Sequence, residues 1–127
     1  MIDEFVQQSF SYKDLYGNDS WISWTPVRVG WTDVGDPTVS GRFHIVGRHC
    51  FIQVEVIPST SVATVAGTSY VELPIAAQGL SGDGSMMNET TLIGVRNVVF
   101  DITNSRVYVP SQIATGDTLT VAGWYEI

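Results

Sequence analysis

Cysteine, lysine and the strong helix formers are scarce in this sequence. Its 127 residues include a single cysteine, Cys50, which excludes an internal disulfide and any zinc site that needs several cysteine ligands. There is also a single lysine, Lys13, and leucine and alanine number only 5 and 6. Valine, isoleucine and threonine number 17, 10 and 12. Because β-branched side chains favour strands, this composition predicts an all-β domain.

Basic clusters and long apolar runs are also missing. The formal net charge is −7 at pH 7, and the 13 acidic residues are scattered along the chain. We expect no nucleic-acid partner, because binding to phosphates needs a basic patch. No apolar run approaches the roughly 20 residues that span a membrane, so we expect no membrane partner. The acidic start of the sequence, MIDEF, also lacks the basic and apolar regions of a secretion signal.

Residues 1–20 are predicted to form an N-terminal arm. Apolar residues recur there at near-helical spacing, namely Ile2, Phe5, Val6 and Phe10. A short isolated helix is marginal in water, so this segment needs a surface on which to dock. The tract Gly17–Ser20 is a turn signal that ends the arm. Two interpretations stay open: the four apolar residues bind a partner, or they pack on the core of their own domain.

Residues 21–127 are predicted to form one β-sandwich domain. The clearest strand is His49–Ile57, where alternate residues are apolar and one face should therefore pack in the core. That face carries Cys50, Ile52, Val54 and Val56, and the opposite face carries Phe51, Gln53 and Glu55. The last strand, Thr118–Ile127, alternates in the same way, with Leu119, Val121 and Tyr125 on the expected core face and Trp124 on the other.

The remaining pattern indicates eight to nine short strands at spacings of about ten residues, as in a sandwich or barrel. An antiparallel β-sandwich with a jelly-roll arrangement is the natural interpretation. Asp33–Ser40 is expected to be a loop, and so is the glycine-rich stretch Ile75–Met87. Asn104–Ser105 is expected to be a two-residue hairpin turn.

No catalytic site, metal site or cofactor is predicted, and the chain is not expected to be an enzyme. His44 and His49 flank a predicted turn, but a metal would need a third ligand, and surface histidines on a hairpin are the favoured interpretation. Cys50 lies on the expected core face, where a free cysteine behaves as a small hydrophobic residue. Glu55 and Glu72 could serve a glycoside hydrolase, but acids on outward strand faces are ordinarily solvated.

Tryptophan is the more informative residue, and the chain has four of them: Trp21, Trp24, Trp31 and Trp124. Trp24 and Trp31 border predicted loops, and Trp124 is out of phase with the core face of its strand. Exposed aromatic residues favour interfaces, because they bury a large area at low entropic cost. They also stack on sugar rings, in which case Asp83 or Asn88 would supply hydrogen bonds. A subunit interface or ordinary core packing is favoured over sugar binding.

Three sequence features together resemble a pattern seen in tailed phages. They are the stretch SGRFHIVGRHCFIQV of residues 40–54, the pair Leu73–Pro74, and the closing GWYEI of residues 123–127. The pattern resembles the small β-sandwich modules of tailed-phage virions, which occur at tail-fibre tips and in proteins that decorate the capsid.

This resemblance implies a homotrimeric jelly roll with structural or adhesive work. A capsid decoration, or cement, protein that binds the major capsid protein and stabilises the capsid is the first expectation, with the arm as an apolar anchor. The alternative is a tail-fibre or head-fibre module that recognises a host surface glycan. In both cases the resemblance implies a location in the virion, after assembly in the bacterial cytoplasm of the host.

Overall fold

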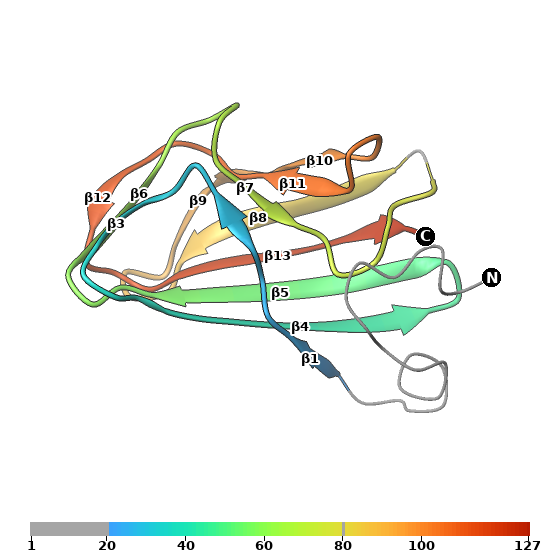
Figure 1. The fold of residues 1–127 in the computed structure, drawn as a ribbon, viewed down its shortest axis with the longest axis horizontal. Coiled ribbons are helices and arrows are strands. Elements are labelled where there is room, and N and C mark those ends of the chain that lie inside the picture. Colours follow the sequence, from blue (N-terminus) through green and yellow to red (C-terminus); the bar gives the residue numbers. More distant parts are fainter. Residues whose placement is uncertain (1–20, 80) are drawn as a thin grey trace.

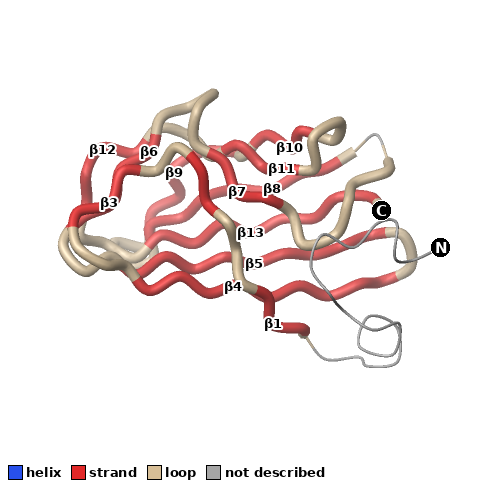
Figure 2. Tube along the Cα trace, in the orientation of Figure 1, coloured by secondary structure: helices blue, strands red, loops and turns tan. Residues whose placement is uncertain are grey.

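The computed structural model describes residues 21–79 and 81–127, which form strands joined by loops and turns with no helix among them (Figure 2). The predicted arm, with Ile2, Phe5, Val6 and Phe10, lies outside the described residues. The strands are β1 (Ile22–Trp24), β2 (Arg28–Val29), β3 (Thr32–Val34), β4 (Thr38–Val46), β5 (His49–Ile57), β6 (Ser61–Thr64), β7 (Tyr70–Glu72), β8 (Gly82–Asn88), β9 (Ile93–Asn97), β10 (Val99–Asp101), β11 (Arg106–Tyr108), β12 (Gln112–Thr115) and β13 (Leu119–Glu126).

These strands make three antiparallel sheets in two layers (Figure 1). One layer is a six-stranded sheet in the order β1-β4-β5-β13-β8-β9. The other layer contains a four-stranded sheet, β10-β11-β7-β2, and a three-stranded sheet, β12-β6-β3. The all-β class is confirmed, and the arrangement is consistent with a β-sandwich. The jelly-roll order stays a prediction.

The core lies between the two layers and follows the alternation of the strands. On β5 the predicted core residues are all buried, namely Cys50, Ile52, Val54 and Val56. Leu119, Val121 and Tyr125 of β13 are buried beside them, as predicted. The Tyr125 ring stacks on Phe100 of β10, with ring centroids 5.7 Å apart, and its hydroxyl donates a 2.7 Å hydrogen bond to the carbonyl of Ile75. Tyr125 therefore ties the last strand of one layer to the other layer.

The prediction of a long loop over Ile75–Met87 is wrong for its second half. Residues Gly82–Asn88 form β8, which pairs with β13 and β9 inside the six-stranded sheet. A Cβ atom on Gly84 would collide with the carbonyl oxygen of Ala122, and one on Gly82 would lie 2.7 Å from the Phe100 ring. These glycines are therefore packing residues of a strand, where a side chain has no room, rather than signs of a loop.

Two shorter predictions also need correction. Asp33–Ser40 is not one loop, because β3 ends at Val34 and β4 begins at Thr38. The turn predicted at Asn104–Ser105 spans residues 102–105, between β10 and β11, and Ser105 has a φ of 51°. The Asp101 carboxylate closes this turn by accepting hydrogen bonds from the backbone and side-chain nitrogens of Asn104.

None of the described residues belongs to a helix long and apolar enough to cross a membrane.

Candidate functional site

The outer face of the six-stranded sheet carries a line of aromatic side chains. Because Cys50 and Ile52 point into the core, Phe51 between them points out of the sheet. Phe51 pairs with His44 on β4 and with Trp124 on β13, and Trp124 pairs in turn with Asp83 on β8. The register of four neighbouring strands therefore places these four side chains in one line across the sheet.

Trp21 extends this line beyond β4. Its ring lies 5.8 Å from the His44 ring, and the Arg42 guanidinium lies 4.8 Å from the Trp21 centroid, within the range of a cation–π contact. At the other end His49 packs edge-on against Trp124 at 5.1 Å. Trp21 is 43% exposed and Phe51 is 37% exposed, while Trp124 is half-buried. We call Trp21, His44, Phe51 and Trp124 the aromatic row.

A hollow runs alongside the aromatic row. One part, of about 230 Å³, is lined by Trp21, Phe51 and Trp124 together with Arg42 and Gln53. The other part, of about 440 Å³, is lined by polar side chains, namely Ser23, Ser40, Arg42, Gln53, Glu55, Glu89 and Thr120. Because Arg42 and Gln53 line both parts, the two hollows adjoin, and we call them together the groove, with an aromatic end and a polar end.

The polar end of the groove has a fixed hydrogen-bond geometry and an acidic border. Arg42 Nε donates a 2.6 Å hydrogen bond to Gln53 Oε1, from the next strand of the sheet. Glu55 and Glu89 supply two carboxylates, and Asp83 lies beyond Trp124 at the aromatic end. The groove therefore combines flat apolar faces with hydrogen-bond donors and acceptors, as ligand-binding clefts do.

Only one of the three tryptophans predicted as interface or glycan candidates, Trp124, lies in this groove. Trp24 is 5% exposed and belongs to the core, so the interface and glycan interpretations are wrong for this residue and the alternative of ordinary core packing is confirmed. Trp24 pairs with Gly41, and a Cβ on Gly41 would lie 2.8 Å from the Trp24 ring. The missing side chain at Gly41 lets the indole ring lie close against β4, where it also contacts Phe43 edge-on at 6.3 Å.

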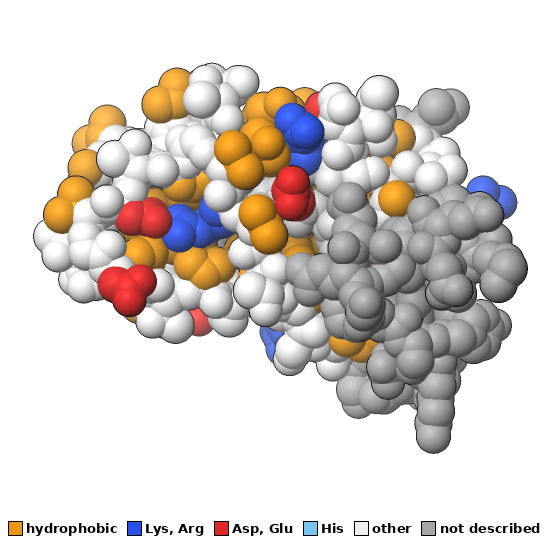
Figure 3. Space-filling view, in the orientation of Figure 1, with side chains coloured by type: hydrophobic (Ala, Val, Ile, Leu, Met, Phe, Trp, Pro, Cys, Tyr) orange, Lys and Arg blue, Asp and Glu red, His pale blue; other side chains and the backbone are white. Residues whose placement is uncertain are grey.

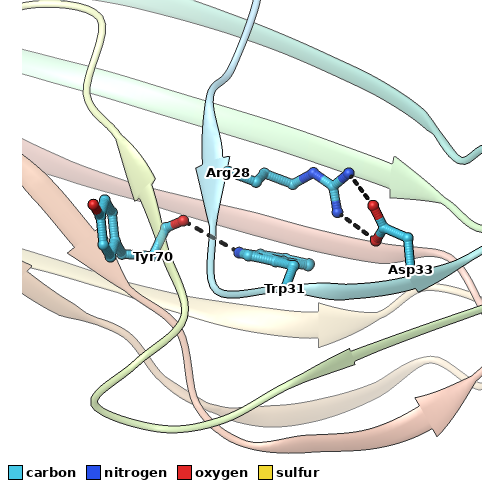
Figure 4. Close-up of polar contacts among 4 residues, drawn as sticks. All are labelled: Arg28, Trp31, Asp33 and Tyr70. Atoms are coloured by element: carbon cyan, nitrogen blue, oxygen red, sulfur yellow. Dashed lines mark hydrogen bonds and ion pairs between the residues drawn. The ribbon is translucent and has the colours of Figure 1, made fainter.

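Trp31 is half-buried, and its contacts join neighbouring strands (Figure 4). Its indole Nε1 donates a 3.2 Å hydrogen bond to the carbonyl of Tyr70, which joins it to β7. The Arg28 guanidinium lies 5.1 Å from the indole centroid and forms two 2.9 Å hydrogen bonds with the Asp33 carboxylate. Trp31 therefore fastens the edge strand β2 to its neighbours, and it lies outside the aromatic row.

The hydrogen-bond partners suggested for a sugar differ in their surroundings. Asp83 lies beside Trp124 in the row, although one of its carboxylate oxygens already accepts a hydrogen bond from the backbone of Gly84. Asn88 is engaged locally, because its Oδ1 accepts hydrogen bonds from the backbone nitrogens of Thr90 and Thr91 after β8. The structure therefore brings Asp83, but not Asn88, to the aromatic row.

The other titratable candidates do not converge. His44 and His49 contact different tryptophans, and no cluster of three or more potential metal ligands occurs among residues 21–79 and 81–127. Cys50 is buried, and this burial raises the pKa of its thiol to about 12, so it is no thiolate nucleophile at neutral pH. Glu55 lies in the six-stranded sheet and Glu72 in the four-stranded sheet, so these two carboxylates are separated by the core.

The outer face of the four-stranded sheet carries a second aromatic feature. Tyr70 and Tyr108 pair across β7 and β11 with ring centroids 5.3 Å apart. Val29 on β2 and Val99 on β10 continue this line on either side, and both are exposed. We call Val29, Tyr70, Tyr108 and Val99 the tyrosine band. Figure 3 shows apolar side chains gathered over this sheet, with basic and acidic groups among them.

A charged line runs parallel to the tyrosine band. Arg106 pairs with Glu72 on one side and with Asp101 on the other, and its guanidinium lies 4.2 Å from the Tyr70 centroid. The hydrogen bonds from Asn104, with a smaller contribution from Arg106, hold the pKa of Asp101 below its ordinary value. This face therefore combines an apolar band with a line of charges of alternating sign.

Sequence reasoning missed Phe51, Arg42 and Gln53 as groove residues, although it placed Phe51 and Gln53 on the outward face of their strand. The missing information was the register, which brings them beside Trp124 and Trp21. No family model, curated protein or solved structure matches this chain. The proposed functions therefore rest on the geometry of the two outer faces.

Proposed function

We propose that this chain is a non-catalytic structural protein of a tailed-phage virion, a capsid decoration protein that binds the major capsid protein as a homotrimer. The observation that supports this proposal is the tyrosine band. It presents a continuous apolar line across a whole sheet, and Val99 at its end is 66% exposed. Contiguous apolar surface of this kind marks protein–protein contacts, in which tyrosine is enriched.

The charged line beside the band adds specificity to such a contact. Glu72, Arg106 and Asp101 alternate in sign across three strands, so a partner must match the order of the charges as well as the apolar line. The net charge of −7 helps to keep free trimers soluble before they dock on the capsid. A protein that binds only the assembled capsid stabilises it through mass action.

Mass in solution tests the first part of this proposal. We expect light scattering to give the mass of a trimer for the wild type and of a monomer for Val99→Asp, because the aspartate would be desolvated inside the contact. Ile113→Asp is the matched control, since Ile113 is 85% exposed on β12 and lies outside the band. A monomeric wild type at high concentration, or equal dissociation of both variants, would contradict the trimer.

Capsid binding tests the second part. Undecorated capsids should bind the wild-type protein and melt at a higher temperature once it is bound. Deletion of residues 2–16 should weaken that binding if the arm anchors the protein. Undiminished binding of the deletion variant rules out the arm as the anchor, and no binding by the wild type rules out the decoration role.

The aromatic row and its groove support a second candidate, a receptor-binding module that recognises a host surface glycan. A binding partner made only of apolar side chains would leave the polar end of the groove without hydrogen bonds, whereas a sugar would supply them. Adsorption of the isolated protein to host cells separates the candidates. Adsorption that Trp124→Ala abolishes favours the receptor-binding role, and binding to capsids alone favours decoration.

A further inference from the structure

We propose that the groove binds an uncharged glycan chain that runs along the strands of the six-stranded sheet, from the aromatic row to the polar end. In this arrangement one sugar ring rests on Phe51 and Trp124, and the hydroxyl groups of the rings that follow bond to Arg42, Gln53 and Glu55. The inference rests on the second candidate function and gives it a site, a direction and a ligand class.

The aromatic row gives one end of the glycan chain a platform. His44, Phe51 and Trp124 come from adjacent strands, which lie about 4.8 Å apart in a sheet. This spacing is comparable to the width of one pyranose ring, so one ring can contact Phe51 and Trp124 together. Phe51 and Trp124 are direct cross-strand neighbours and are only partly buried, so both offer surface to a ligand. Trp21, at the end of the row, allows a third contact.

The polar end of the groove matches the hydroxyl groups of the same ligand. A guanidinium has five N–H donors, and the bond from Arg42 to Gln53 uses the one on Nε. Gln53 is held in turn by that bond, which fixes its amide before any ligand arrives. Glu55 and Glu89 line the same part and accept hydrogen bonds only, so they suit hydroxyl donors.

The charge of the groove selects against acidic glycans. Glu55 and Glu89 border the polar end, and Asp83 follows Trp124 in the row. Arg42, the one cation among the described residues that line the groove, is already engaged by Gln53 and by the face of Trp21. A uronic or sialic acid would therefore meet two or three carboxylates for each guanidinium, which costs free energy in a partly desolvated site. An uncharged sugar avoids this repulsion.

A protein partner fits the groove less well than a glycan. The larger part of the groove is lined by seven polar side chains and only one glycine, and covering it with apolar side chains would leave buried polar groups unpaired. The tyrosine band on the opposite layer has fewer such groups and suits a protein surface better. The two faces can therefore hold different ligands at the same time.

A glycan array is the first test, because it presents uncharged, uronic and sialylated oligosaccharides side by side to fluorescently labelled wild-type protein. We expect binding to uncharged members and none to acidic ones. Trp124→Ala and Phe51→Ala should each lower the affinity for the best uncharged member about ten-fold, which corresponds to the ~1.4 kcal/mol of a good stacking contact. Ile113→Ala, a change of an exposed apolar residue on β12 outside the groove and the tyrosine band, is the control and should leave this affinity unchanged.

Charge variants sharpen the test. Gln53→Glu keeps the acceptor for Arg42 as a charge-assisted bond, but it removes the amide N–H donors and adds a third carboxylate to the polar end, so it should weaken binding to uncharged glycans. Glu55→Gln should retain that binding and improve binding to acidic members. Thermal unfolding and mass in solution confirm that each variant is folded and assembled like the wild type.

The outcomes separate this inference from the proposed functions. Binding to acidic glycans alone, or affinities that the Trp124 and Phe51 variants leave unchanged, overturns the proposed site. A trimeric wild type that decorates capsids but binds no glycan on the array overturns the inference and leaves the decoration role intact. Loss of capsid binding by Trp124→Ala would show that the groove meets the capsid protein instead, which also overturns it.

Discussion

The two layers of this sandwich expose different chemistry on their outer faces. The six-stranded sheet presents indole, phenyl and imidazole rings beside a groove with a polar end. The four-stranded sheet presents two tyrosines between two valines, beside a line of alternating charges. On both faces the outward side chains are set by the alternation along each strand, and both layers pack against the same core.

The difference shows how neighbouring residues decide what an aromatic side chain does. On the six-stranded sheet the rings border a hollow, so a small ligand can enter and replace water. On the four-stranded sheet Tyr70 and Tyr108 lie next to exposed valines, and the apolar line reaches both edges of the sheet. The first surface suits a ligand with hydroxyl groups, and the second suits a broad protein partner.

Removal of a core residue should destabilise the whole sandwich and give the largest effect. Phe43 is fully buried and contacts Trp24, so we expect Phe43→Ala to lower the free energy of unfolding by about 3–5 kcal/mol, as measured by urea titration. Phe51→Ala is the matched control, because the same change on the next strand removes a ring that is 37% exposed. Similar losses for the two variants would contradict the assignment of Phe43 to the core and Phe51 to the surface.

A change between β8 and β13 should disturb the six-stranded sheet alone. A Cβ on Gly123 would collide with the carbonyl oxygen of Asp83 and lie 2.8 Å from Cα of Gly84. We therefore expect Gly123→Ala to lower the free energy of unfolding by about 1–3 kcal/mol in urea titration. It should also lower the glycan affinity of the groove more than it disturbs assembly through the tyrosine band. Gly94→Ala on β9 is the control, because a Cβ there meets nothing within 4 Å. Equal stability of the two variants would argue against the close approach of these strands.

Alkaline pH should lower the stability of the core and therefore of both faces. Burial raises the pKa of the Cys50 thiol from 9.0 to about 12, and burial likewise raises the pKa of Tyr125 well above 10.0. The unfolded thiol ionises near its ordinary value while the folded thiol stays neutral, so its contribution to stability is complete below pH 9 and is lost between pH 9 and about 12. Each such group costs at most about 1.4 kcal/mol per pH unit in that window.

Urea titrations at pH 7, 9 and 10 measure this loss. Cys50→Ala lowers stability at every pH because it leaves a cavity, but its decline above pH 9 should be shallower than that of the wild type. An identical slope would show that Cys50 is not the titrating group. An Ellman thiol assay adds a second readout, in which Cys50 should react only after unfolding.

The smallest effect is expected at the edge of the four-stranded sheet. Asp33→Asn removes one charge from the pair that covers Trp31, and partly exposed ion pairs contribute less than about 1 kcal/mol. We expect a slight fall in melting temperature and a red shift of Trp31 fluorescence, while the glycan affinity of the groove stays unchanged. Asp36→Asn, an exposed aspartate of the same segment, is the control and should change neither signal. A lower glycan affinity of the Asp33→Asn variant would show that the two faces are coupled.

The strands with regular alternation were predictable because the signal lies within each strand. The pattern of β5 identified its four core residues and placed Phe51 and Gln53 on the outer face, and β13 was recognised in the same way. β8 was not recognised, since Gly82 and Gly84 look like loop residues until Phe100 and Gly123 are seen to occupy the space beside them. Trp24 was misplaced for a related reason, because its site in the core exists only where Gly41 leaves room.

The sequence by itself determined the all-β class, the alternation of β5 and β13, and the burial of Cys50, because these follow from backbone preference and from the two-residue period of a strand. The tertiary structure decided the functional surfaces. Trp124 lies beside Phe51, and Tyr70 beside Tyr108, only through the register of strands that are far apart in the chain. Register is a property of pairing between strands, and no local pattern specifies which residues will face each other.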